Sequence, residues 1–434
     1  MSLRSFLKEL DKKGLLVSEG EASPEYEAPY IISAKSRQGP ALVFRLRGFP
    51  GFMGIGNILD TRDKLRMALN ASSDAELYEK LINAENSPAK PTETSDAAFK
   101  PLPEVDLRKL PIPRFFEKEP TNCLTSGVVL GLGTYINASI HRLSVIDKDK
   151  FVIRLVPRNL YSIHQENKAR NKDTPIAIVW GAHPAFLLAS ASSPPFGVSE
   201  LDVAARLLDY KVFQLSNGLL VPSEAEVVME GYISKDHEAD EGPCVDIMGT
   251  YDIIRKQPIV KITRVYVREE PIYSHILVAG SPENSVLMGF EKEARIWNSV
   301  RGVTDVKSVR LTPGGGGWLH AVVSIRKKVE GEGKNAILAA FAAHPSLKHV
   351  VIVDDDIDPD DPMQVEWAIA TRFRGDKDLV MVANVRGSSL DPVAMDQAIG
   401  LTTKVGIDAT KPVGSNQTKF ERAKIPRKQT SSKE

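Results

Sequence analysis

Between residues 123 and 263 the chain is a succession of short β-branched runs, a texture that few folds accommodate. The clearest runs lie at residues 128–130, 143–146, 151–156 and 176–180. Residues 147–150 read Asp-Lys-Asp-Lys and predict a hairpin turn between two of the runs. Short strands at this spacing indicate an antiparallel sheet closed into a barrel. We expect one helix within it, at residues 199–211, with Ser199 as its N-cap.

The region before this sheet has a mixed α/β pattern. Apolar residues at helical spacing predict a helix that begins near residue 2. Short apolar runs at 30–32 and 41–44, separated by Gly and Pro, predict strands, and residues 61–84 are typical of helices. Residues 86–113 are rich in Pro, Ser, Lys and Glu, which predicts a linker that wraps the surface.

A different pattern begins after the glycine run at residues 314–317. Strand and helix patterns then alternate, which predicts a small, mostly parallel sheet with helices on its faces. The last residues, from 412, are polar and basic, and we expect them to be mobile or to lie on a partner subunit. We therefore expect four parts: an N-terminal α/β region with linker (1–113), a barrel domain (114–311), a C-terminal α/β domain (312–411) and a tail (412–434).

Composition excludes several classes of protein. The 56 basic and 56 acidic residues cancel, so no overall charge attracts nucleic acid or an anionic membrane. No apolar run approaches the length of a membrane span, and the N-terminus does not resemble a signal peptide. Cys123 and Cys244 are the only cysteines and suggest no disulfide framework, which favours a reducing cytoplasm.

Two carboxylates, Glu241 and Asp246, flank a Gly-Pro pair that breaks any helix. The bend allows both acids to face one cavity, and two acids in different environments suit general acid/base chemistry. The alternative is an exposed acidic loop, because residues 236–241 form a run of charge.

Other motifs favour structural roles. The glycine run lacks the Lys-Ser/Thr of a phosphate loop and precedes a strand, so we expect a domain junction. The acidic run at 354–361 could gather a divalent cation, but a strand-end loop that caps the next helix is the preferred interpretation. His183 and His164 lack a nucleophile nearby and are expected to be structural or surface residues. His141 and Arg142 are expected on opposite faces of a strand.

Several motifs occur in one order between about residues 120 and 411. They are Asn137 to Arg142, Arg154 to Arg158, Gly181-Ala182-His183-Pro184, Ser199-Glu200, Glu241 to Asp246, Asp354 to Asp356, Trp367 to Arg372 and Lys404 to Thr410. In this order and spacing the chain resembles the UbiD family of decarboxylases. The resemblance implies an α+β and α/β multidomain protein whose central split β-barrel, similar to flavin reductases, carries the cofactor.

The resemblance also implies prenylated FMN as cofactor and reversible, non-oxidative decarboxylation of an unsaturated or aromatic acid. It assigns Asn137 and Glu200 to a divalent metal, with manganese expected and potassium as a further candidate. The residues implied to lie along the cofactor are Ser139, Ile140, His141, Arg142, Arg154, Leu155 and Val156. Arg142, Glu241 and Asp246 match the catalytic set. Arg158 stands where most members have a metal-binding His, and a guanidinium holds a phosphate rather than a metal.

This assignment suits the chemistry, because loss of CO2 from an sp2 carbon needs an electron sink that only a cofactor supplies. Arg142 would orient the substrate carboxylate, Glu241 would hold Arg142 and relay protons, and Asp246 would donate the proton.

The chain is most similar to the archaeal branch of the family, which implies trans-anhydromevalonate 5-phosphate as substrate and isopentenyl phosphate as product. One alternative is a decarboxylase of a hydroxybenzoate, polyprenylated or not; another is a non-catalytic flavin-binding subunit. The expected partners are a prenyltransferase that supplies the cofactor and further copies of this chain, associated through the C-terminal domain.

Overall fold

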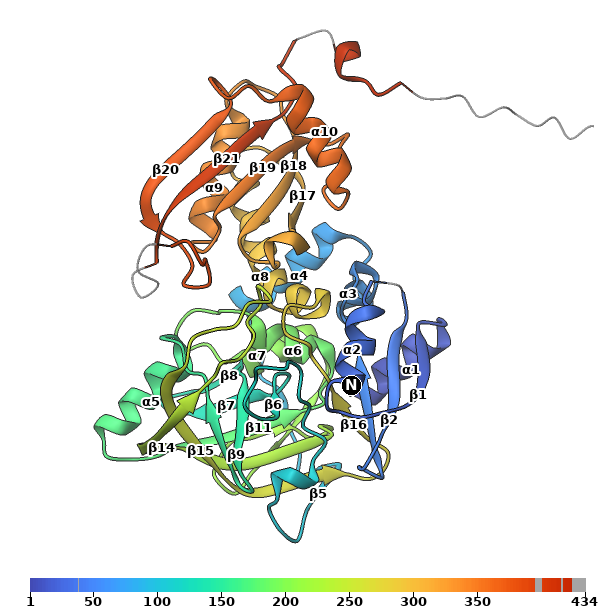
Figure 1. The fold of residues 1–434 in the computed structure, drawn as a ribbon, viewed down its shortest axis with the longest axis vertical. Helices are drawn as coiled ribbons and strands as arrows, with labels where there is room; N and C mark the ends of the chain where they lie inside the picture. The colour runs from blue at the N-terminus through green and yellow to red at the C-terminus, as the bar shows by residue number, and fades with distance from the viewer. Residues whose placement is uncertain (38, 395–399, 415–416, 424–434) are drawn as a thin grey trace, which may run out of the picture. The chain divides into compact units, whose positions relative to one another are not determined.

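The structure is a computed structural model of the 434-residue chain and describes all of it except residues 38, 395–399, 415–416 and 424–434. It divides into two compact units, one of residues 1–295 with 311–320 and one of residues 296–310 with 321–434. Both units mix helices and sheets (Figure 1), so the predicted α/β multidomain class is confirmed. The predicted tail at 412–434 lies partly outside the described residues.

The N-terminal part of the first unit is a four-stranded sheet with helices. The strands in spatial order are β1 (Leu16–Ala22), β2 (Ala41–Leu46), β3 (Phe52–Gly56) and β16 (Ile272–His275). The helices are α1 (Leu3–Lys12), α2 (Glu27–Ala34), α3 (Arg62–Leu69) and α4 (Asp74–Asn86). The predicted first helix is confirmed: Ser2 caps α1, which buries Leu3, Phe6, Leu7 and Leu10.

One predicted strand in this part is wrong. Residues 30–32 lie in α2, where Ile32 is fully buried. An apolar run of three residues is too short for its periodicity to separate strand from helix. The run at 41–44 does form a strand, within β2.

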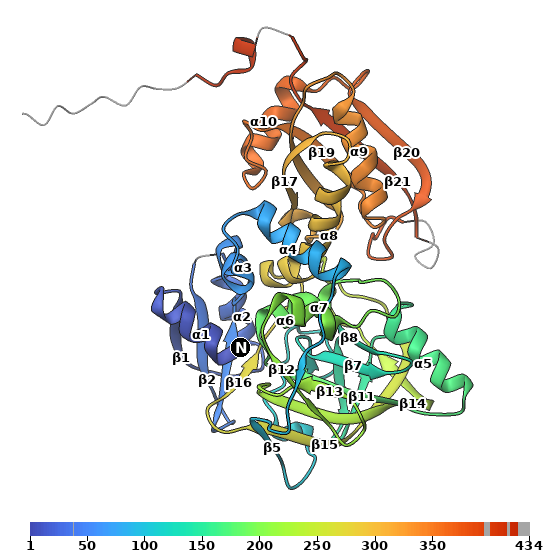
Figure 2. The ribbon, with the colours of Figure 1, turned by 180° about the vertical axis from the view of Figure 1, so that it is seen from behind.

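The central sheet of the first unit holds four of the predicted site residues, Asn137, Ser139, Ile140 and Glu241. Its strands in spatial order are β6 (Cys123–Leu124), β9 (Leu143–Asp147), β10 (Lys150–Ile153), β15 (Arg255–Arg268), β14 (Val227–Glu241), β11 (Thr174–Trp180), β7 (Val128–Leu132) and β8 (Ile136–Ile140), and β5 (Phe99–Pro101) pairs with β15. The hairpin turn at 147–150 is confirmed, since β9 and β10 pair antiparallel with Asp147 opposite Lys150. Figure 2 shows the long strands β14 and β15 running through the sheet.

This sheet is strongly curled. β8 and β9 lie six strand positions apart in the sheet, yet only residues 141 and 142 connect them. In a flat sheet the six steps would span about 29 Å, whereas two linking residues reach about 11 Å at most. The sheet must therefore bend its two ends toward each other, and the register shifts at 230/231 and 233/238 in the β14–β15 pair are bulges of the kind that bend strands.

The prediction of a closed barrel is wrong. Within the part of the chain that the structure describes, the end strands β6 and β8 are not hydrogen-bonded to each other. β6 contains only two residues, and both pair with β9, so it offers no ladder that could close the sheet.

Helices and a small sheet pack around the central sheet. The helices are α5 (Asn159–Ala169), α6 (Pro184–Ala191) and α7 (Glu200–Leu207), and the small sheet has the order β13 (Leu220–Pro222), β12 (Lys211–Gln214), β4 (Thr92–Glu93). A further helix, α8 (Pro282–Val300), begins close to the N-terminal sheet, where Glu283 accepts from the backbones of Asn57 and Leu59. The predicted cap Ser199 is confirmed, because its side chain accepts a hydrogen bond from the Leu201 backbone, but α7 ends at 207 rather than 211. The predicted linker at 86–113 also holds η1 (Leu107–Lys109), and its Leu107, Leu110 and Ile112 are buried in the core of the central sheet.

The C-terminal unit contains the predicted alternation of strands and helices. Its strands in spatial order are β17 (Asp305–Leu311), β18 (His320–Arg326), β19 (His349–Asp354), β21 (Leu401–Ala409) and β20 (Leu379–Arg386), its helices are α9 (Glu332–Ala343) and α10 (Pro362–Arg372), and η3 (Gln417–Phe420) follows. α9 packs on β19 and β21. Asp361 caps α10, as predicted for the acidic run. The glycine run lies at η2 (Pro313–Gly315) and belongs to the first unit.

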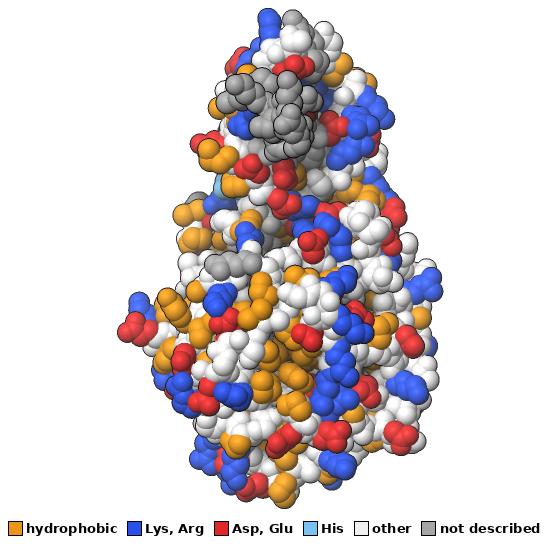
Figure 3. All heavy atoms as spheres, turned by 90° about the vertical axis from the view of Figure 1, so that its right-hand side faces the viewer, with side chains coloured by type: hydrophobic (Ala, Val, Ile, Leu, Met, Phe, Trp, Pro, Cys, Tyr) orange, Lys and Arg blue, Asp and Glu red, His pale blue; other side chains and the backbone are white. Residues whose placement is uncertain are grey.

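The surface carries mixed charge. Figure 3 shows acidic and basic side chains interspersed over the face in view, as expected from their equal numbers. Among the described residues, no helix is both long and apolar enough to span a membrane.

Candidate active site

Arg142 and Glu241 form a bidentate ion pair. Arg142 Nε donates to Glu241 Oε1 at 2.6 Å, and Nη2 donates to Oε2 at 2.9 Å. Glu241 is the last residue of β14 and is fully buried, while the Arg142 side chain is 14% exposed. Burial disfavours the charged form of Arg142, but the hydrogen bonds and charge of Glu241 outweigh it, so the pKa of Arg142 is raised. Arg142 stays cationic at any physiological pH.

The strand position predicted for His141 and Arg142 is wrong. Both residues lie in the short link between β8 and β9, outside the described strands. The chain must cross there from one end of the curled sheet to the other, so it leaves the ladder. Their side chains still have different partners: His141 contacts Ser139 and the Arg154 carbonyl, whereas Arg142 turns to Glu241.

Asp252 is a second partner of Arg142, which the sequence analysis missed. Its Oδ2 accepts from Arg142 Nη2 at 2.9 Å and from Arg255 Nη1 at 2.6 Å, and its Oδ1 accepts from Arg255 Nη2 at 2.9 Å. Arg154 Nε lies 3.7 Å from the same Oδ2. The only signal in the sequence is that Asp252 follows the Gly-Pro bend closely and that Arg255 begins the next strand. The register of the β14–β15 pair explains why these residues meet, because Arg255 lies directly opposite Glu241.

Asp246 lies apart from this ion pair. Its Oδ1 accepts from the Met248 backbone at 2.8 Å and from Thr250 Oγ1 at 3.3 Å. Within the described residues no hydrogen bond or ion pair joins Asp246 to Arg142 or Glu241. Burial raises the pKa of Asp246, and the nearby charge of Asp252 raises it further. Asp246 therefore holds its proton to a higher pH than an exposed aspartate.

The loop that carries these acids is held by its neighbours. Gly242 has a φ of +99°, which favours glycine, and a Cβ there would lie 3.3 Å from the Ile253 carbonyl oxygen. The Cys244 carbonyl accepts from the Asp252 backbone at 2.9 Å.

Cys123 and Cys244 are both free and buried, and Ser144 Oγ lies 3.7 Å and 3.6 Å from their sulfurs. The two cysteines thus meet beside the acidic loop without forming a disulfide.

Asn137 and Glu200 are in direct contact. Glu200 accepts from Asn137 Nδ2 at 2.8 Å and from the Ala138 backbone at 2.7 Å. Burial raises the pKa of Glu200 to about 7, although hydrogen bonds from Ala138 and Asn137 oppose this. Its hydrogen-bond donors are neutral, so a buried carboxylate here favours a bound cation. No group of three or more His, Cys, Asp or Glu among the described residues is placed to hold a metal, so other oxygens must complete any metal site.

Ser139 and His141 extend the row from Asn137. Ser139 Oγ lies 3.0 Å from Asn137 Oδ1 and 2.9 Å from His141 Nε2. Burial and then the charge of Arg158 lower the pKa of His141 to about 4, against the hydrogen bond to the Arg154 carbonyl. His141 is therefore neutral at pH 7. Because His141 Nδ1 contacts that carbonyl at 3.0 Å, it carries the hydrogen and leaves Nε2 as an acceptor. Ile140, between them, ends β8.

The residues from Arg154 to Val156 follow β10. The Leu155 backbone donates to Gln257 Oε1 at 2.7 Å, and the Leu155 side chain is buried. Val156 is 36% exposed. Burial, and then the positive charge of Arg255, lower the pKa of Arg154. This segment therefore lies between the Arg142 cluster and the His141 row.

Arg158 and Lys292 are two cations close enough for the charge of Arg158 to act on Lys292. Burial lowers the pKa of Arg158, and burial together with the charge of Arg158 lowers the pKa of Lys292 to about 8. Lys292, on α8, contacts Ser193 Oγ at 3.2 Å and pairs with Glu291. No acidic side chain in the described chain forms an ion pair with Arg158, which is an exposed residue. Lys292 could not be recognised from the sequence, because Glu-Lys-Glu on a helix is typical of a solvated face.

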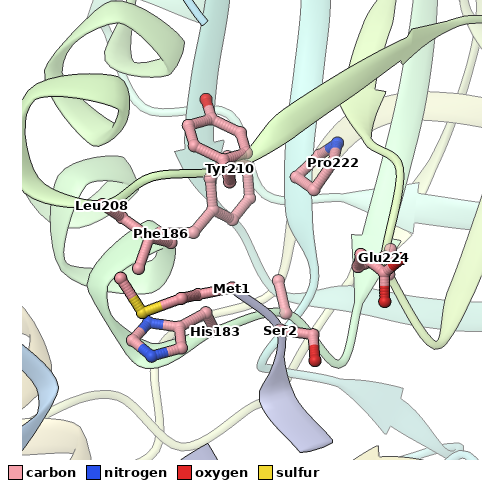
Figure 4. A pocket seen from close by; sticks show the side chains of 10 residues that line it. Met1, Ser2, His183, Phe186, Leu208, Tyr210, Pro222 and Glu224 are labelled. Carbon is pink, nitrogen blue, oxygen red and sulfur yellow. The ribbon is translucent and has the colours of Figure 1, made fainter. Parts of the chain in front are cut away.

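Two histidines have structural roles, as predicted. His183 caps α6, where Nδ1 accepts from the Ala185 backbone at 3.1 Å. Figure 4 shows Met1 and Ser2 beside His183, Phe186 and Tyr210 in a pocket of about 10 Å³, which has room for one water molecule at most. His164 is buried, with Nδ1 3.0 Å from Thr174 Oγ1.

Family models match nearly the whole chain. They describe the N-terminal domain of 3-octaprenyl-4-hydroxybenzoate carboxy-lyase at residues 7–85, its Rift-related domain at 90–282 and its C-terminal domain at 285–409. The chain belongs to the UbiD family. The resemblance inferred from the motifs is therefore confirmed.

Several proteins are similar to this UbiD-family chain over nearly its whole length. The anhydromevalonate phosphate decarboxylase of Aeropyrum pernix is 45% identical over 98% of this chain and 96% of its own length. The UbiD-class enzyme HmfF from Pelotomaculum thermopropionicum, solved with FMN, superposes with a TM-score of 0.92 at 33% identity, covering 98% of both chains. An evolved dimeric form of HmfF with prenylated FMN gives a TM-score of 0.88 at 32% identity, covering 98% of this chain and 97% of its own.

Proposed function

We propose that this chain is a prenylated-FMN-dependent decarboxylase that converts trans-anhydromevalonate 5-phosphate to isopentenyl phosphate. The observation that carries the proposal is the full-length identity of 45% to a relative named anhydromevalonate phosphate decarboxylase. The buried Arg142–Glu241 pair supports it, because a fixed guanidinium suits a carboxylate substrate.

Arg142 would bind the substrate carboxylate. Glu241 and Asp252 occupy its Nε and Nη2, and in the described part of the chain no acceptor bonds its Nη1. Two carboxylates hold the guanidinium plane in a single orientation, so Nη1 is a preset donor for the substrate. Glu241 fixes this geometry and would relay protons.

Asp246 would return a proton to the substrate carbon. Its raised pKa keeps the acid form available at higher pH than for an exposed aspartate. Its hydrogen bonds come from Met248 and Thr250, and it lies in the loop that follows Glu241.

The residues fit a prenylated flavin mononucleotide with a divalent metal. Arg158 and Lys292 would hold the phosphate dianion, because two neighbouring cations favour a doubly charged anion. Asn137 and Glu200 would bind the metal, with manganese expected, and phosphate oxygens and water would complete its oxygen ligands. Ser139, Ile140, His141, Arg154, Leu155 and Val156 would line the cofactor. When bound, this cofactor supplies the electron sink for CO2 loss. Potassium remains a prediction without an assigned ligand.

The architecture proposed with this function is a split β-barrel within residues 114–311. The curled but open central sheet supports that class. We further propose that the C-terminal α/β domain (312–411) mediates self-association, that a prenyltransferase supplies the cofactor and that the protein is cytoplasmic. A dimeric form of the relative HmfF supports self-association.

The aromatic alternative, a hydroxybenzoate decarboxylase, has one supporting observation, namely the carboxy-lyase named in the family models. The non-catalytic alternative is disfavoured by the presence of Arg142, Glu241 and Asp246.

The test uses protein co-expressed with the prenyltransferase, whose absorption spectrum reports loading. Loaded protein is then given trans-anhydromevalonate 5-phosphate, 4-hydroxybenzoate or 3-octaprenyl-4-hydroxybenzoate, and CO2 and product are measured. We expect turnover of the phosphorylated acid only. Turnover of an aromatic acid alone would replace the proposed substrate, and a loaded protein inactive on all three would overturn the proposal.

A further inference from the structure

Three guanidinium groups converge on one carboxylate beside the proposed carboxylate site. Asp252 is bonded to Arg142 and Arg255 and lies near Arg154, and the Arg255 side chain is 25% exposed. Glu241 is the second carboxylate bonded to Arg142, and the charges of Glu119 and Asp246 act on Arg142 and Asp252 from a longer distance. In this partly desolvated cluster, a guanidinium nitrogen that has no acceptor favours an anionic ligand.

The Arg255 guanidinium is held in one orientation but still has a hydrogen-bond donor to offer. Both of its terminal nitrogens donate to Asp252, at 2.6 Å and 2.9 Å, which fixes the guanidinium plane. Within the residues that the structure describes, no acceptor bonds Arg255 Nε. Because Arg142 Nη2 and Arg255 Nη1 share one oxygen of Asp252, the two guanidinium groups are immediate neighbours.

We propose that Arg255 is a specificity-determining residue that binds a second anionic group of the substrate, a phosphate monoester, and that Asp252 is the positioning residue that aligns Arg255 with Arg142. The inference rests on the proposed function, since Arg142 there takes the carboxylate. Arg158 and Lys292, beside the Asn137–Glu200 row, form a separate cationic pair that the cofactor phosphate would occupy. Two cationic clusters suit a phosphorylated cofactor and a phosphorylated substrate.

The alternative is that the Asp252–Arg255 pair only fastens the loop after β14. A fastening role predicts equal effects on phosphorylated and unphosphorylated ligands, whereas recognition predicts loss for the phosphorylated one alone. The neighbouring Lys256 offers a matched control, because its side chain is 64% exposed and pairs with Asp240 on the outside.

The binding test uses FMN-loaded protein, so that the cofactor phosphate site is filled, and calorimetric titration with isopentenyl phosphate or isopentenol. We expect Arg255→Gln to weaken isopentenyl phosphate binding by about tenfold to a hundredfold, the range for a lost charged hydrogen bond. Binding of isopentenol should not change, Arg255→Lys should restore part of the affinity, and Lys256→Gln should match the wild type. Equal affinity in Arg255→Gln, equal loss for both ligands, or no binding of isopentenyl phosphate to the wild type would each overturn the proposal.

Turnover separates this inference from the proposed function. In the prenylated-FMN enzyme, Arg255→Gln should raise KM for the phosphorylated acid and leave kcat nearly unchanged, whereas Asp252→Asn should also lower kcat because Arg142 loses a partner. A wild type that decarboxylates while Arg255→Gln behaves identically would refute the inference alone. A wild type that binds isopentenyl phosphate through Arg255 but releases no CO2 would refute the proposed function alone.

Discussion

Arg142 and Glu241 are joined by two parallel hydrogen bonds, of 2.6 Å and 2.9 Å, although 99 positions separate them in the chain. One residue leaves the link between β8 and β9, and the other ends β14. The curl of the central sheet brings them together, and Glu241 has no exposed surface. The ion pair is therefore a product of the fold rather than of local sequence.

Replacing Glu241 with Gln should lower kcat by about tenfold to a hundredfold, because one of two charged hydrogen bonds to Arg142 is lost. Cofactor loading, read from the absorption spectrum, should be unchanged. Glu230→Gln is the matched control: Glu230 is also buried on β14, but it bonds Ser216 and Tyr266. If both variants lost kcat equally per folded molecule, Glu241 would have no special role.

Asp246→Asn should retain the loop, since an amide oxygen can accept the Met248 bond, yet should lose about a hundredfold or more in kcat for want of a proton donor. Wild-type activity should fall as pH rises through the raised pKa of Asp246, because the acid form is the donor. Asp240→Asn, an exposed change on β14, serves as control. Full activity of Asp246→Asn would remove Asp246 from its role.

The affinity for FMN should fall as pH rises through about 8, where Lys292 loses its charge. Because burial depresses this pKa below that of an unfolded lysine, FMN binding is strongest below pH 8 and weakens above it. Lys292→Gln should bind FMN weakly with little pH dependence between 7 and 9. Lys404→Gln is the matched control, because burial also lowers the pKa of Lys404, in the other unit, to about 8. Its affinity for FMN should depend on pH as in the wild type. A wild-type affinity for FMN that did not change with pH would contradict the assignment of Lys292 to the phosphate.

Gly242→Ala should destabilise the protein by about 1–2 kcal/mol, because its φ of +99° suits only glycine and the new Cβ meets the Ile253 carbonyl. It should also lower kcat, since Glu241 precedes it and Asp252 packs in the same loop. Gly331→Ala has a similar φ of +93° with open space around it, and should cost stability without loss of kcat. Thermal unfolding and kcat, measured together, check this; equal kcat in both variants would count against the loop's role.

Local pattern predicted the elements well where it was long and periodic. The first helix, the hairpin at 147–150 and the C-terminal alternation have clear periodicity and turn chemistry, and all are present. The run at 30–32 was too short to assign, and the closed barrel could not be distinguished from a curled open sheet, because closure depends on whether two distant edge strands pair.

Only part of the candidate site could be predicted from the sequence. Motif order singled out Arg142, Glu241 and Glu200, but Asp252, Arg255 and Lys292 are ordinary charges until the fold buries them. Their importance comes from register and packing: Arg255 lies opposite Glu241, and Lys292 lies beside Arg158. Such relationships between distant segments are set by tertiary structure, which no single window of sequence contains.

The central claim is tested most directly with trans-anhydromevalonate 5-phosphate labelled with carbon-13 at the carboxylate. Enzyme loaded with prenylated FMN should release labelled CO2 and form isopentenyl phosphate in equal amounts, and Glu241→Gln loaded to the same absorbance should release far less. A fully loaded wild type that releases no labelled CO2 would contradict the account.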